Sequence, residues 1–393
     1  MKIAQIIPFF APAWGYGGPV RVCFDISREL AKRGHEVTVL TTDAYDHTKR
    51  IGKLCEVIDL VRVLRFRNVS NVLAKKANLF LPRGFKKYFR SHVKDYDLVH
   101  LHSFFTYQNI VCAKYCRKYK IPYILHLHEM PAPIPLFKKT LIKKIFNILY
   151  GKRLLRDASK ILVVSSQEKK RLLSSMPDLK DKVEVVLNPI SSTTQKRERS
   201  NRQKFGLKET DKVLLFLGRL GFIKGLDRLI DAFALLVRND PSYKLIIAGP
   251  DEGEKAKLDR KIADLQLGDN VIFTGFVEGK TKEELFASSD VFVLFSYYES
   301  FSLAALEALS HNVPVCLSKD VGISEELMKY QCAAVVSDPQ NPAETAQKIK
   351  WVYNERANLS KNCAVALKQF DIGKVADKIV IIYQKCIKTR SAN

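Results

Sequence analysis

Short apolar runs of strand length alternate with longer stretches of helical periodicity along most of the chain, and this alternation constrains the fold most strongly. The first run is residues 3–9, a helical stretch over 20–33 stops at Gly34, and the next run is 35–40. Strands joined through helices run parallel, and parallel strands carry helices on both faces. The pattern therefore predicts doubly wound α/β sheets. The other predicted strands are 61–66, 98–101, 123–127, 160–164, 183–186, 213–217, 244–248, 271–273, 291–294 and 313–317.

A polar stretch at residues 191–201 has no hydrophobic period and divides this pattern into two series. A chain of 393 residues with 47% hydrophobic content has enough apolar residues for a core on each side. We therefore predict two facing Rossmann-like domains, 1–190 and 202–370, with an interdomain cleft. A C-terminal helix over 371–393 is expected to pack back toward the first domain. In such sheets, ligands bind beyond the carboxyl ends of the strands.

Charge is divided unequally between the two halves of the chain. The net charge is +24, and residues 1–190 hold 35 Lys and Arg against 15 Asp and Glu, whereas residues 191–393 hold 30 against 26. This imbalance indicates that the first domain faces a polyanion. No apolar run approaches the roughly 18 residues of a membrane span, and the start has no secretory cleavage site. The eight cysteines are scattered, without zinc-ligand or disulfide spacing. We therefore expect a cytoplasmic protein.

The turn after the first strand of the second series has the composition of an anion site. Gly218 and Arg219 close the strand, and Lys224 and Gly225 precede a helix that starts at Leu226. Free amides at a helix N-terminus and the helix dipole both favour an anion. Arg binds two phosphate oxygens at once, and Lys adds a point charge. The alternative interpretation is an ordinary glycine loop with surface cations.

A second constellation follows the strand predicted at 291–294. Glu299 stands at the strand's carboxyl end, Ser300 or Ser302 can cap the next helix, and Glu307 lies one to two turns into it among apolar neighbours. Amides near the cap are free to bind phosphate, and carboxylates on an apolar element need polar partners such as sugar or ribose hydroxyls. The alternative is one capping and one solvent-facing glutamate.

Together these motifs resemble glycosyltransferase family 4, which has the GT-B fold and retains the anomeric configuration. The resemblance rests on the two glutamates with seven residues between them, on the Ser-Phe-Ser-Leu segment after Glu299, and on Gly218-Arg219 with Lys224-Gly225. The Gly17-Gly18 loop, the 98–102 strand, His128 and Asn188 extend it over nearly the whole chain. One departure is Pro189-Ile190 after Asn188, where a glycine is common; another is Glu129-Met130.

The resemblance implies a role for each matching residue of the second domain. Arg219 and Lys224 would neutralise the donor diphosphate, Glu299 would contact the donor sugar, and Glu307 would hold the ribose. The backbone at Gly275-Phe276-Val277 would bind the nucleobase. The residues expected to bind the donor nucleotide sugar are Gly17, Gly18, Arg219, Lys224, Phe276, Val277, Glu299, Ser300, Phe301, Ser302, Leu303 and Glu307, and those expected to be catalytic are His128, Glu299, Arg219 and Lys224.

In the first domain, Gly17 and Gly18 would let the backbone approach the donor, although a tight turn explains them equally well. The resemblance places His128 beside the anomeric carbon. His126 shares its strand face, so either ring is a candidate, and the roles of His100 and His102 remain open. We expect no catalytic metal and no cofactor besides the UDP- or GDP-linked donor sugar, because cationic side chains replace the metal.

The predicted reaction is retaining transfer of a hexosyl or N-acetylhexosaminyl group to a lipid-linked glycan acceptor, as in surface-polysaccharide or glycoconjugate synthesis. One alternative is a transferase acting on a small polar acceptor such as an inositol or sugar phosphate. Another is a non-catalytic binding module, which the intact motif set disfavours.

Two basic segments suggest where a polyanion binds. Residues 136–156 contain seven basic residues and no acidic one, with apolar residues largely on one helical face, and residues 83–94 interleave five cations with aromatic rings. Such helices suit anionic lipid headgroups, so we expect a peripheral protein on the inner face of the cell membrane. The alternative is a helix that packs on its own domain. No nucleic-acid-binding motif is present.

Overall fold

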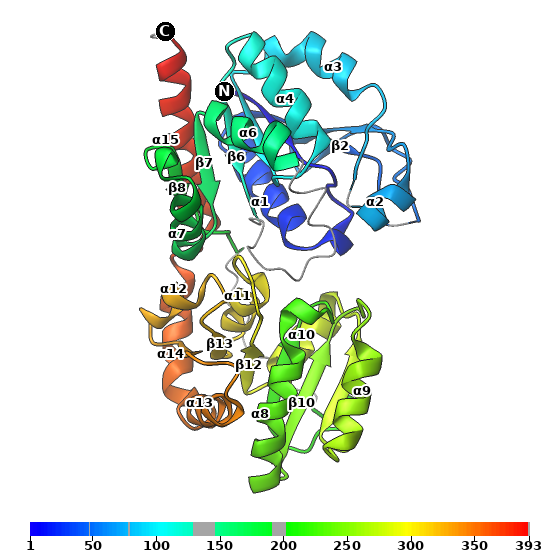
Figure 1. Ribbon diagram of the computed structural model, residues 1–393, viewed down its shortest axis with the longest axis vertical. Coiled ribbons are helices and arrows are strands. Elements are labelled where there is room, and N and C mark those ends of the chain that lie inside the picture. Colours follow the sequence, from blue (N-terminus) through cyan, green and yellow to red (C-terminus); the bar gives the residue numbers. More distant parts are fainter. Residues whose placement is uncertain (47, 78, 129–145, 191–201, 392–393) are drawn as a thin grey trace. The chain divides into compact units, whose positions relative to one another are not determined.

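The computed structural model describes residues 1–46, 48–77, 79–128, 146–190 and 202–391. The chain divides into two compact units: unit 1 is Met1–Ser191 with Ile372–Asn393, and unit 2 is Ser192–Asp371 (Figure 1). The linker predicted at 191–201 lies outside the described residues. Each unit is a mostly or wholly parallel sheet with helices on both faces, the doubly wound layout that the alternation predicts.

Unit 1 contains an eight-stranded sheet in the order β3-β4-β2-β1-β5-β6-β7-β8. Only the β3–β4 pair is antiparallel. The edge strand β3 was not predicted, because its turn places Asp59 and Leu60 at positive φ without the Asn-Gly type of signal. The first strand also ends at residue 6 rather than 9. The strands are β1 (Lys2–Ile6), β2 (Glu36–Thr42), β3 (Cys55–Ile58), β4 (Val61–Phe66), β5 (Leu98–His102), β6 (Tyr123–His126), β7 (Lys160–Val163) and β8 (Val183–Val185).

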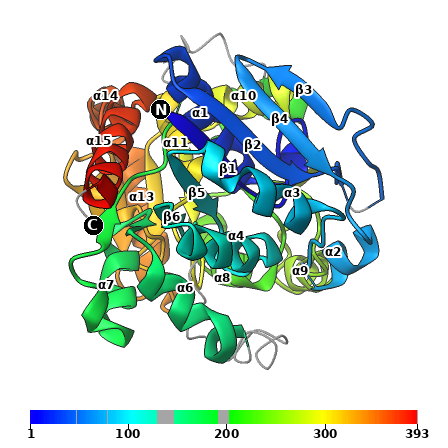
Figure 2. The ribbon, with the colours of Figure 1, turned by 90° about the horizontal axis from the view of Figure 1, so that it is seen from above.

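The two faces of this sheet differ in chemistry. Ala4 and Ile6 belong to an apolar cluster with the buried rings of α3 and the apolar side of α4. Gln5 lies between them in sequence and therefore faces the other side, where it contacts α15. Figure 2 shows α1 on one side of the sheet and α3 with α4 on the other. The helices are α1 (Gly18–Lys32), α2 (Asn71–Ala77), α3 (Phe85–His92), α4 (Tyr107–Lys118), α6 (Lys152–Asp157), α7 (Ser166–Ser175) and α15 (Ile372–Ser391), with short turns η1 (Trp14–Tyr16), η2 (Val93–Asp95), η3 (Asn147–Gly151) and η4 (Pro177–Leu179).

The last helix, α15, belongs to unit 1 although the chain reaches it through unit 2. Arg33, just after α1, donates to the carboxylate of Asp377 at 2.6 Å and to the backbone carbonyl of Gly373 at 2.9 Å. Further along α15, the Tyr383 side chain is fully buried against the sheet. The helix is therefore part of the wall of unit 1.

Unit 2 contains a six-stranded, wholly parallel sheet in the order β11-β10-β9-β12-β13-β14. The strands are β9 (Lys212–Leu217), β10 (Tyr243–Ala248), β11 (Val271–Gly275), β12 (Val291–Leu294), β13 (Val315–Ser318) and β14 (Ala333–Val336), the last of which was not predicted. The helices are α8 (Leu226–Asn239), α9 (Lys255–Asp264), α10 (Gly279–Ser288), α11 (Leu303–Ser310), α12 (Ser324–Met328), α13 (Pro342–Asn354) and α14 (Arg356–Leu367), with turns η5 (Arg202–Phe205) and η6 (Phe222–Lys224).

The sequence predicts no membrane-spanning segment and no disulfide framework. Within the described ranges, no helix has the length and apolar character needed to cross a bilayer. All eight cysteines are free thiols, and Cys55 alone is exposed.

A buried ion pair anchors the start of unit 2. Arg202 donates to both carboxylate oxygens of Asp290 at 3.1 Å, and Asp290 also accepts the backbone N–H of Val213 at 2.9 Å. Both charged side chains are about nine-tenths buried. Loss of one partner would leave the other charge buried without compensation.

We predict that Asp290→Ala lowers the unfolding free energy of unit 2 by about 3–5 kcal/mol. The chain has one tryptophan in each unit, so a Trp14→Phe background lets Trp351 fluorescence report the denaturant unfolding of unit 2. Asp259→Ala, which removes an exposed i,i+4 pair with Lys255, should cost at most about 0.5 kcal/mol. Equal unfolding midpoints for Asp290→Ala and Asp259→Ala would contradict the stabilising role of the Arg202–Asp290 pair.

Candidate functional site

The strand order of unit 2 creates a switch point between β9 and β12. From β9 the chain proceeds through β10 and β11 toward one edge, then returns to β12 and proceeds toward the other. The loops after β9 and β12 consequently leave the same sheet edge in opposite directions, and ligands bind in the crevice that such loops leave. Both motif segments of unit 2 lie in these two loops.

The loop after β9 requires glycine at one point of close approach. Gly225 has φ +65°, and a Cβ there would lie 2.0 Å from the Phe295 carbonyl oxygen just beyond β12. Gly225 is also the N-cap of α8 and supplies no side chain to its first amides. The first amides of α8 are therefore not capped by a side chain of Gly225, and the anion site at this N-terminus stays a prediction.

Lys224 and Glu299 form an ion pair that joins the two switch-point loops. Each side chain is about one-fifth exposed. The Lys224 ammonium has three N–H donors and the carboxylate has two oxygens, so each group keeps capacity for a ligand. The structure therefore brings together two residues that the sequence separates by 75 positions.

Arg219, in the same loop as Lys224, pairs with a different carboxylate. Its guanidinium binds the Glu252 carboxylate at 2.6 Å, and both side chains are well exposed. Glu252 is a partner that the sequence analysis did not identify.

The loop after β12 offers backbone amides. Among the described residues, the N–H groups of Phe301, Ser302 and Leu303 have no hydrogen-bond partner. Ser302 caps α11 by accepting the Ala305 N–H at 3.3 Å, and its own φ is +93°. Few non-glycine residues adopt this φ, so the loop holds Ser302 in a strained conformation. Ser300 is buried nearby, and Phe301 packs edge-on against Phe370.

Glu307 lies in α11 and is bound by Lys282 of α10 at 2.8 Å, with both side chains about one-fifth exposed. Lys282 was missed by sequence reasoning, because its place beside Glu307 depends on how the two helices pack. Each motif glutamate is thus held by a lysine from another loop or helix. Each pair fixes the position of its carboxylate and leaves oxygen lone pairs that can accept further hydrogen bonds.

The segment predicted to bind a nucleobase ends β11. Gly275 has φ +71°, and its carbonyl accepts the Gly249 N–H at 2.8 Å. Phe276 is exposed, with 60% of its surface accessible, and Val277 follows it. Two strands therefore separate this segment from the β12 loop in the sheet order.

In unit 1, Gly17 and Gly18 form the N-terminus of α1. Gly17 is its N-cap with φ +89°, a conformation that favours glycine, and Gly18 is the first helical residue. The sequence left a tight turn and a ligand approach equally open, and the positive φ accounts for Gly17 in either case.

Four histidines gather on the α15 side of the unit 1 sheet, and all are buried. The Nδ1 atom of His102 lies 2.8 Å from Nε2 of His128, and its Nε2 atom lies 2.7 Å from Oε1 of Gln5. The His126 ring stacks on that of His128 at 4.0 Å, so these two side chains share a face as strand alternation predicts. His100 binds the Tyr383 hydroxyl at 2.5 Å.

Burial keeps these imidazoles neutral. Desolvation lowers the pKa of His128 to about 3, and it lowers the pKa of the other three rings well below the ordinary value. His128 itself has φ +56°. A neutral ring hydrogen-bonds at both nitrogens without adding a positive charge.

The expectation that no metal takes part in transfer stays a prediction, but one sequence detail bears on it. Two aspartates two positions apart can together bind a metal ion, and the chain has such an Asp-x-Asp triplet at Asp95-Tyr96-Asp97. It precedes β5 and therefore lies at the amino edge of the sheet, away from the ligand-binding edge. Asp97 accepts the backbone N–H of Lys2 at 2.7 Å, which gives it a structural role.

The two basic segments bear differently on the alternatives of membrane contact and packing on their own domain. In α3 the cations are exposed, but Phe85 and Phe89 are fully buried in the core and cannot act as membrane anchors. Of the second segment, 136–145 lies outside the described residues. Its remainder forms the π-helical turn η3 and then α6, and it exposes Ile148, Leu149 and Tyr150 beside the cations of α6.

The two Rossmann-like units have the GT-B fold, which the solved structures of similar fold share. Residues 197–369 match the family model described as glycosyl transferases group 1, and residues 16–193 match that described as Glycosyltransferase Family 4. The chain belongs to glycosyltransferase family 4.

Known proteins resemble the chain over most of its length. An uncharacterized glycosyltransferase of Methanocaldococcus jannaschii is 29% identical, with 90% of each chain covered. The alpha-monoglucosyldiacylglycerol synthase of Streptococcus pneumoniae is 27% identical over 74% of this chain and 65% of its own. The crystal structure of Anabaena HepE in complex with UDP-glucose has a TM-score of 0.73 and 22% identity, with both chains covered completely.

We predict that unit 1 loses stability as the pH falls below about 6.5, the ordinary pKa of histidine. Because the folded pKa values lie below that value, the unfolded chain binds protons there that the folded chain does not. Each buried histidine should cost about 1.4 kcal/mol per pH unit. Trp14 fluorescence in a Trp351→Phe background, with chelator present, measures this slope between pH 6.5 and 5.

Two matched variants test this slope. His126→Gln should lower it by about 1.4 kcal/mol per pH unit, which corresponds to one proton. His92→Gln, outside the cluster, should leave the slope unchanged. A slope independent of pH would contradict the buried neutral state.

Proposed function

We propose that the protein transfers a hexosyl or N-acetylhexosaminyl group, with retention, from a nucleotide diphosphate sugar to a lipid-linked glycan acceptor. The observation that carries this proposal is the Lys224–Glu299 pair at the switch point, beside the open N-terminus of α11. UDP and UDP-glucose bound to structural neighbours support a nucleotide sugar as the donor. The choice between uridine and guanosine is left to experiment.

The chemistry follows from where charge develops. When the bond from the anomeric carbon to the diphosphate oxygen breaks, negative charge grows on the leaving group. The Lys224 ammonium, with Arg219 and the amides of the α11 loop, would stabilise that charge. The acceptor hydroxyl forms the new bond on the same face of the sugar, and its proton passes to the departing phosphate. Cationic side chains would thus take the place of a metal ion.

The two motif carboxylates would divide the polar recognition of the donor. Glu299 would accept hydrogen bonds from hydroxyl groups of the sugar, and Glu307 would accept hydrogen bonds from hydroxyl groups of the ribose. Lys224 and Lys282 hold both carboxylates in place before the donor arrives, which lowers the ordering cost of binding. His128 is assigned to the donor sugar, where a neutral ring adds no positive charge to an oxocarbenium-like transition state.

A cation-lined hollow in unit 1 supports a phosphorylated acceptor. Its volume is about 340 Å³, and it lies beyond the carboxyl ends of β2 and β4. Arg67 and Arg83 line it, and in the described part of the chain neither side chain has an acidic partner. Arg50, also in the lining, is bound to both oxygens of Asp43.

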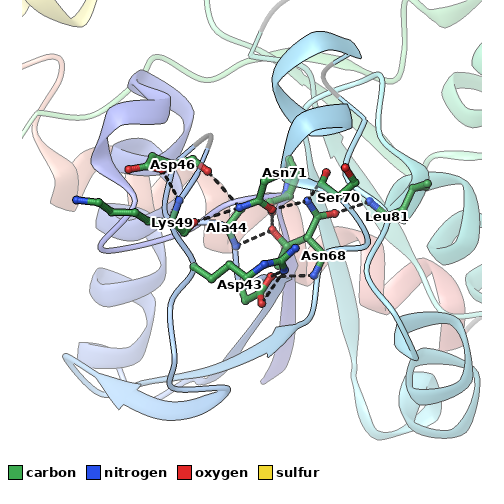
Figure 3. A network of polar contacts seen from close by, with 11 residues as sticks. Asp43, Ala44, Asp46, Lys49, Asn68, Ser70, Asn71 and Leu81 are labelled. Carbon is green, nitrogen blue, oxygen red and sulfur yellow. Dashed lines mark hydrogen bonds and ion pairs between the residues drawn. The ribbon is translucent and has the colours of Figure 1, made fainter.

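The wall of this hollow is organised by a polar network (Figure 3). Asp43 accepts the Asn68 N–H at 2.8 Å, and the Asn68 side chain accepts the Leu81 N–H at 2.9 Å and donates to Asn71 at 3.0 Å. A rigid wall with guanidinium groups suits phosphate oxygens. The diphosphate of a lipid-linked glycan fits this chemistry, and so does the alternative acceptor, an inositol or sugar phosphate.

The lipid-linked acceptor is favoured by exposed apolar side chains beside cations. Ile148, Leu149 and Tyr150 are exposed with Lys152 and Arg153 directly after them. Apolar residues next to basic ones suit the headgroup region of an anionic bilayer. The relative named alpha-monoglucosyldiacylglycerol synthase points the same way.

Our prediction for the donor site is that Lys224→Met lowers kcat/KM by about 10²–10³-fold, the range for loss of one preorganised donor at developing charge. The donor is first identified as the UDP- or GDP-sugar that raises the unfolding midpoint of the wild type. Glu307→Gln should mainly raise KM, since ribose binding is the same in ground and transition states. Lys255→Met, an exposed lysine elsewhere in unit 2, is the control. Wild-type rates in Lys224→Met would disprove the assignment.

For the membrane, we predict co-sedimentation with vesicles that contain anionic lipid and release by salt, but no binding to neutral vesicles. Ile148→Glu with Leu149→Glu should abolish co-sedimentation, because both apolar contacts are lost and negative charge faces the lipid. Val365→Glu with Ile381→Glu adds the same charge at two other exposed apolar positions and should leave binding intact. Turnover of a soluble sugar phosphate without vesicle binding would instead support the alternative acceptor.

A further inference from the structure

We propose that His100, His102 and His126 form a binding site for a divalent transition-metal ion inside unit 1, separate from the donor site of unit 2. One ring nitrogen from each of the three lies within 4.8 Å of those of the other two, and none of the side chains is exposed. The residues come from adjacent parallel strands, with His102 directly opposite His126 in the β5–β6 register. The parallel pairing of β5 with β6 therefore brings the three imidazole rings together.

The unsatisfied nitrogens point to a ligand. In the described structure both ring nitrogens of His126 and the Nε2 atom of His100 are buried without a hydrogen-bond partner. Such groups are costly, since a buried polar atom that has lost water needs a replacement. A metal ion accepts imidazole lone pairs and would remove part of this cost. The large majority of buried side-chain polar atoms in proteins, in contrast, have a hydrogen-bond partner.

The neighbouring polar groups are those that orient metal-binding histidines. A ligating imidazole usually donates its second N–H to an oxygen acceptor, which fixes the tautomer. His100 has the Tyr383 hydroxyl oxygen at its Nδ1 atom, which leaves Nε2 to bind the ion. His102 has the amide oxygen of Gln5 at its Nε2 atom, which leaves Nδ1. His126 offers either nitrogen.

The donor set selects the class of ion. Three neutral imidazoles suit Zn²⁺, Co²⁺, Ni²⁺ or Cu²⁺, whereas Mg²⁺ and Ca²⁺ require oxygen ligands. Zinc binds imidazole nitrogen at about 2.0–2.1 Å, so the rings draw together on binding. The ion also takes the His102 Nδ1 atom away from its 2.8 Å contact with His128. Metal binding and the position of His128 are therefore coupled.

The test uses the full-length protein in a Cys55→Ser background, which removes the exposed thiol. After chelator treatment and dialysis, Co²⁺ is titrated while visible absorption and the thermal unfolding midpoint are recorded. We expect one equivalent of Co²⁺ with ligand-field bands of a low-coordinate site, displacement of the bands by Zn²⁺, and a raised midpoint. Gln5→Leu should weaken binding about 10–100-fold.

His126→Gln should abolish the spectrum, and His92→Gln, outside the cluster, should leave it unchanged. Circular dichroism checks folding, and His100→Gln replaces His126→Gln if the latter does not fold. The proposal is overturned if the wild type gives no low-coordinate Co²⁺ spectrum, or if that spectrum persists in a folded ligand variant. Either result leaves the donor assignment in unit 2 untouched.

Discussion

The pairing of β9 with β12 is the constraint on which the donor site depends. Val291 lies opposite Leu214 and Phe292 opposite Leu215 in adjacent parallel strands, although some 77 residues separate these pairs along the chain. Because both strands end at the same edge, their loops meet, and Lys224 reaches Glu299. The close approach of Gly225 to the Phe295 carbonyl completes this contact. A shift of one residue in this register would turn the side chains of β12 to the opposite face.

Much of this organisation is predictable from the sequence, because its signals are local. The alternation of strands and helices, the glycine turn after β9 and the capped helix after Glu299 each lie within a short stretch. The features that were missed depend on packing. Lys282 is one of two lysines in α10, and only the approach of α10 to α11 makes it the partner of Glu307. The hairpin strand β3 is four residues long and is followed by a turn without an Asn-Gly type of signal. The burial of Phe85 and Phe89 shows that interleaved aromatics can serve the core.

Both units bury matched charges. Arg202 pairs with Asp290 in unit 2, and Arg65 pairs with Glu56 in unit 1. In unit 1, the polar layer under α15 is neutral and contains imidazoles, an amide and a phenol. A neutral layer avoids the desolvation cost of buried ions but relies on each tautomer being matched to its neighbours. The layer thus ties the geometry at His128 to residues as distant in sequence as Tyr383.

The place of α15 has a consequence for how the protein is made. Because unit 1 takes its last helix from residues 372–391, the sheet face that bears Gln5 and His100 lacks its cover while the ribosome is still translating unit 2. The first unit synthesised is therefore the last to be completed. During this interval its open face is a natural target for chaperones, and a premature stop that removed only α15 would spare every donor-site residue yet leave that face bare.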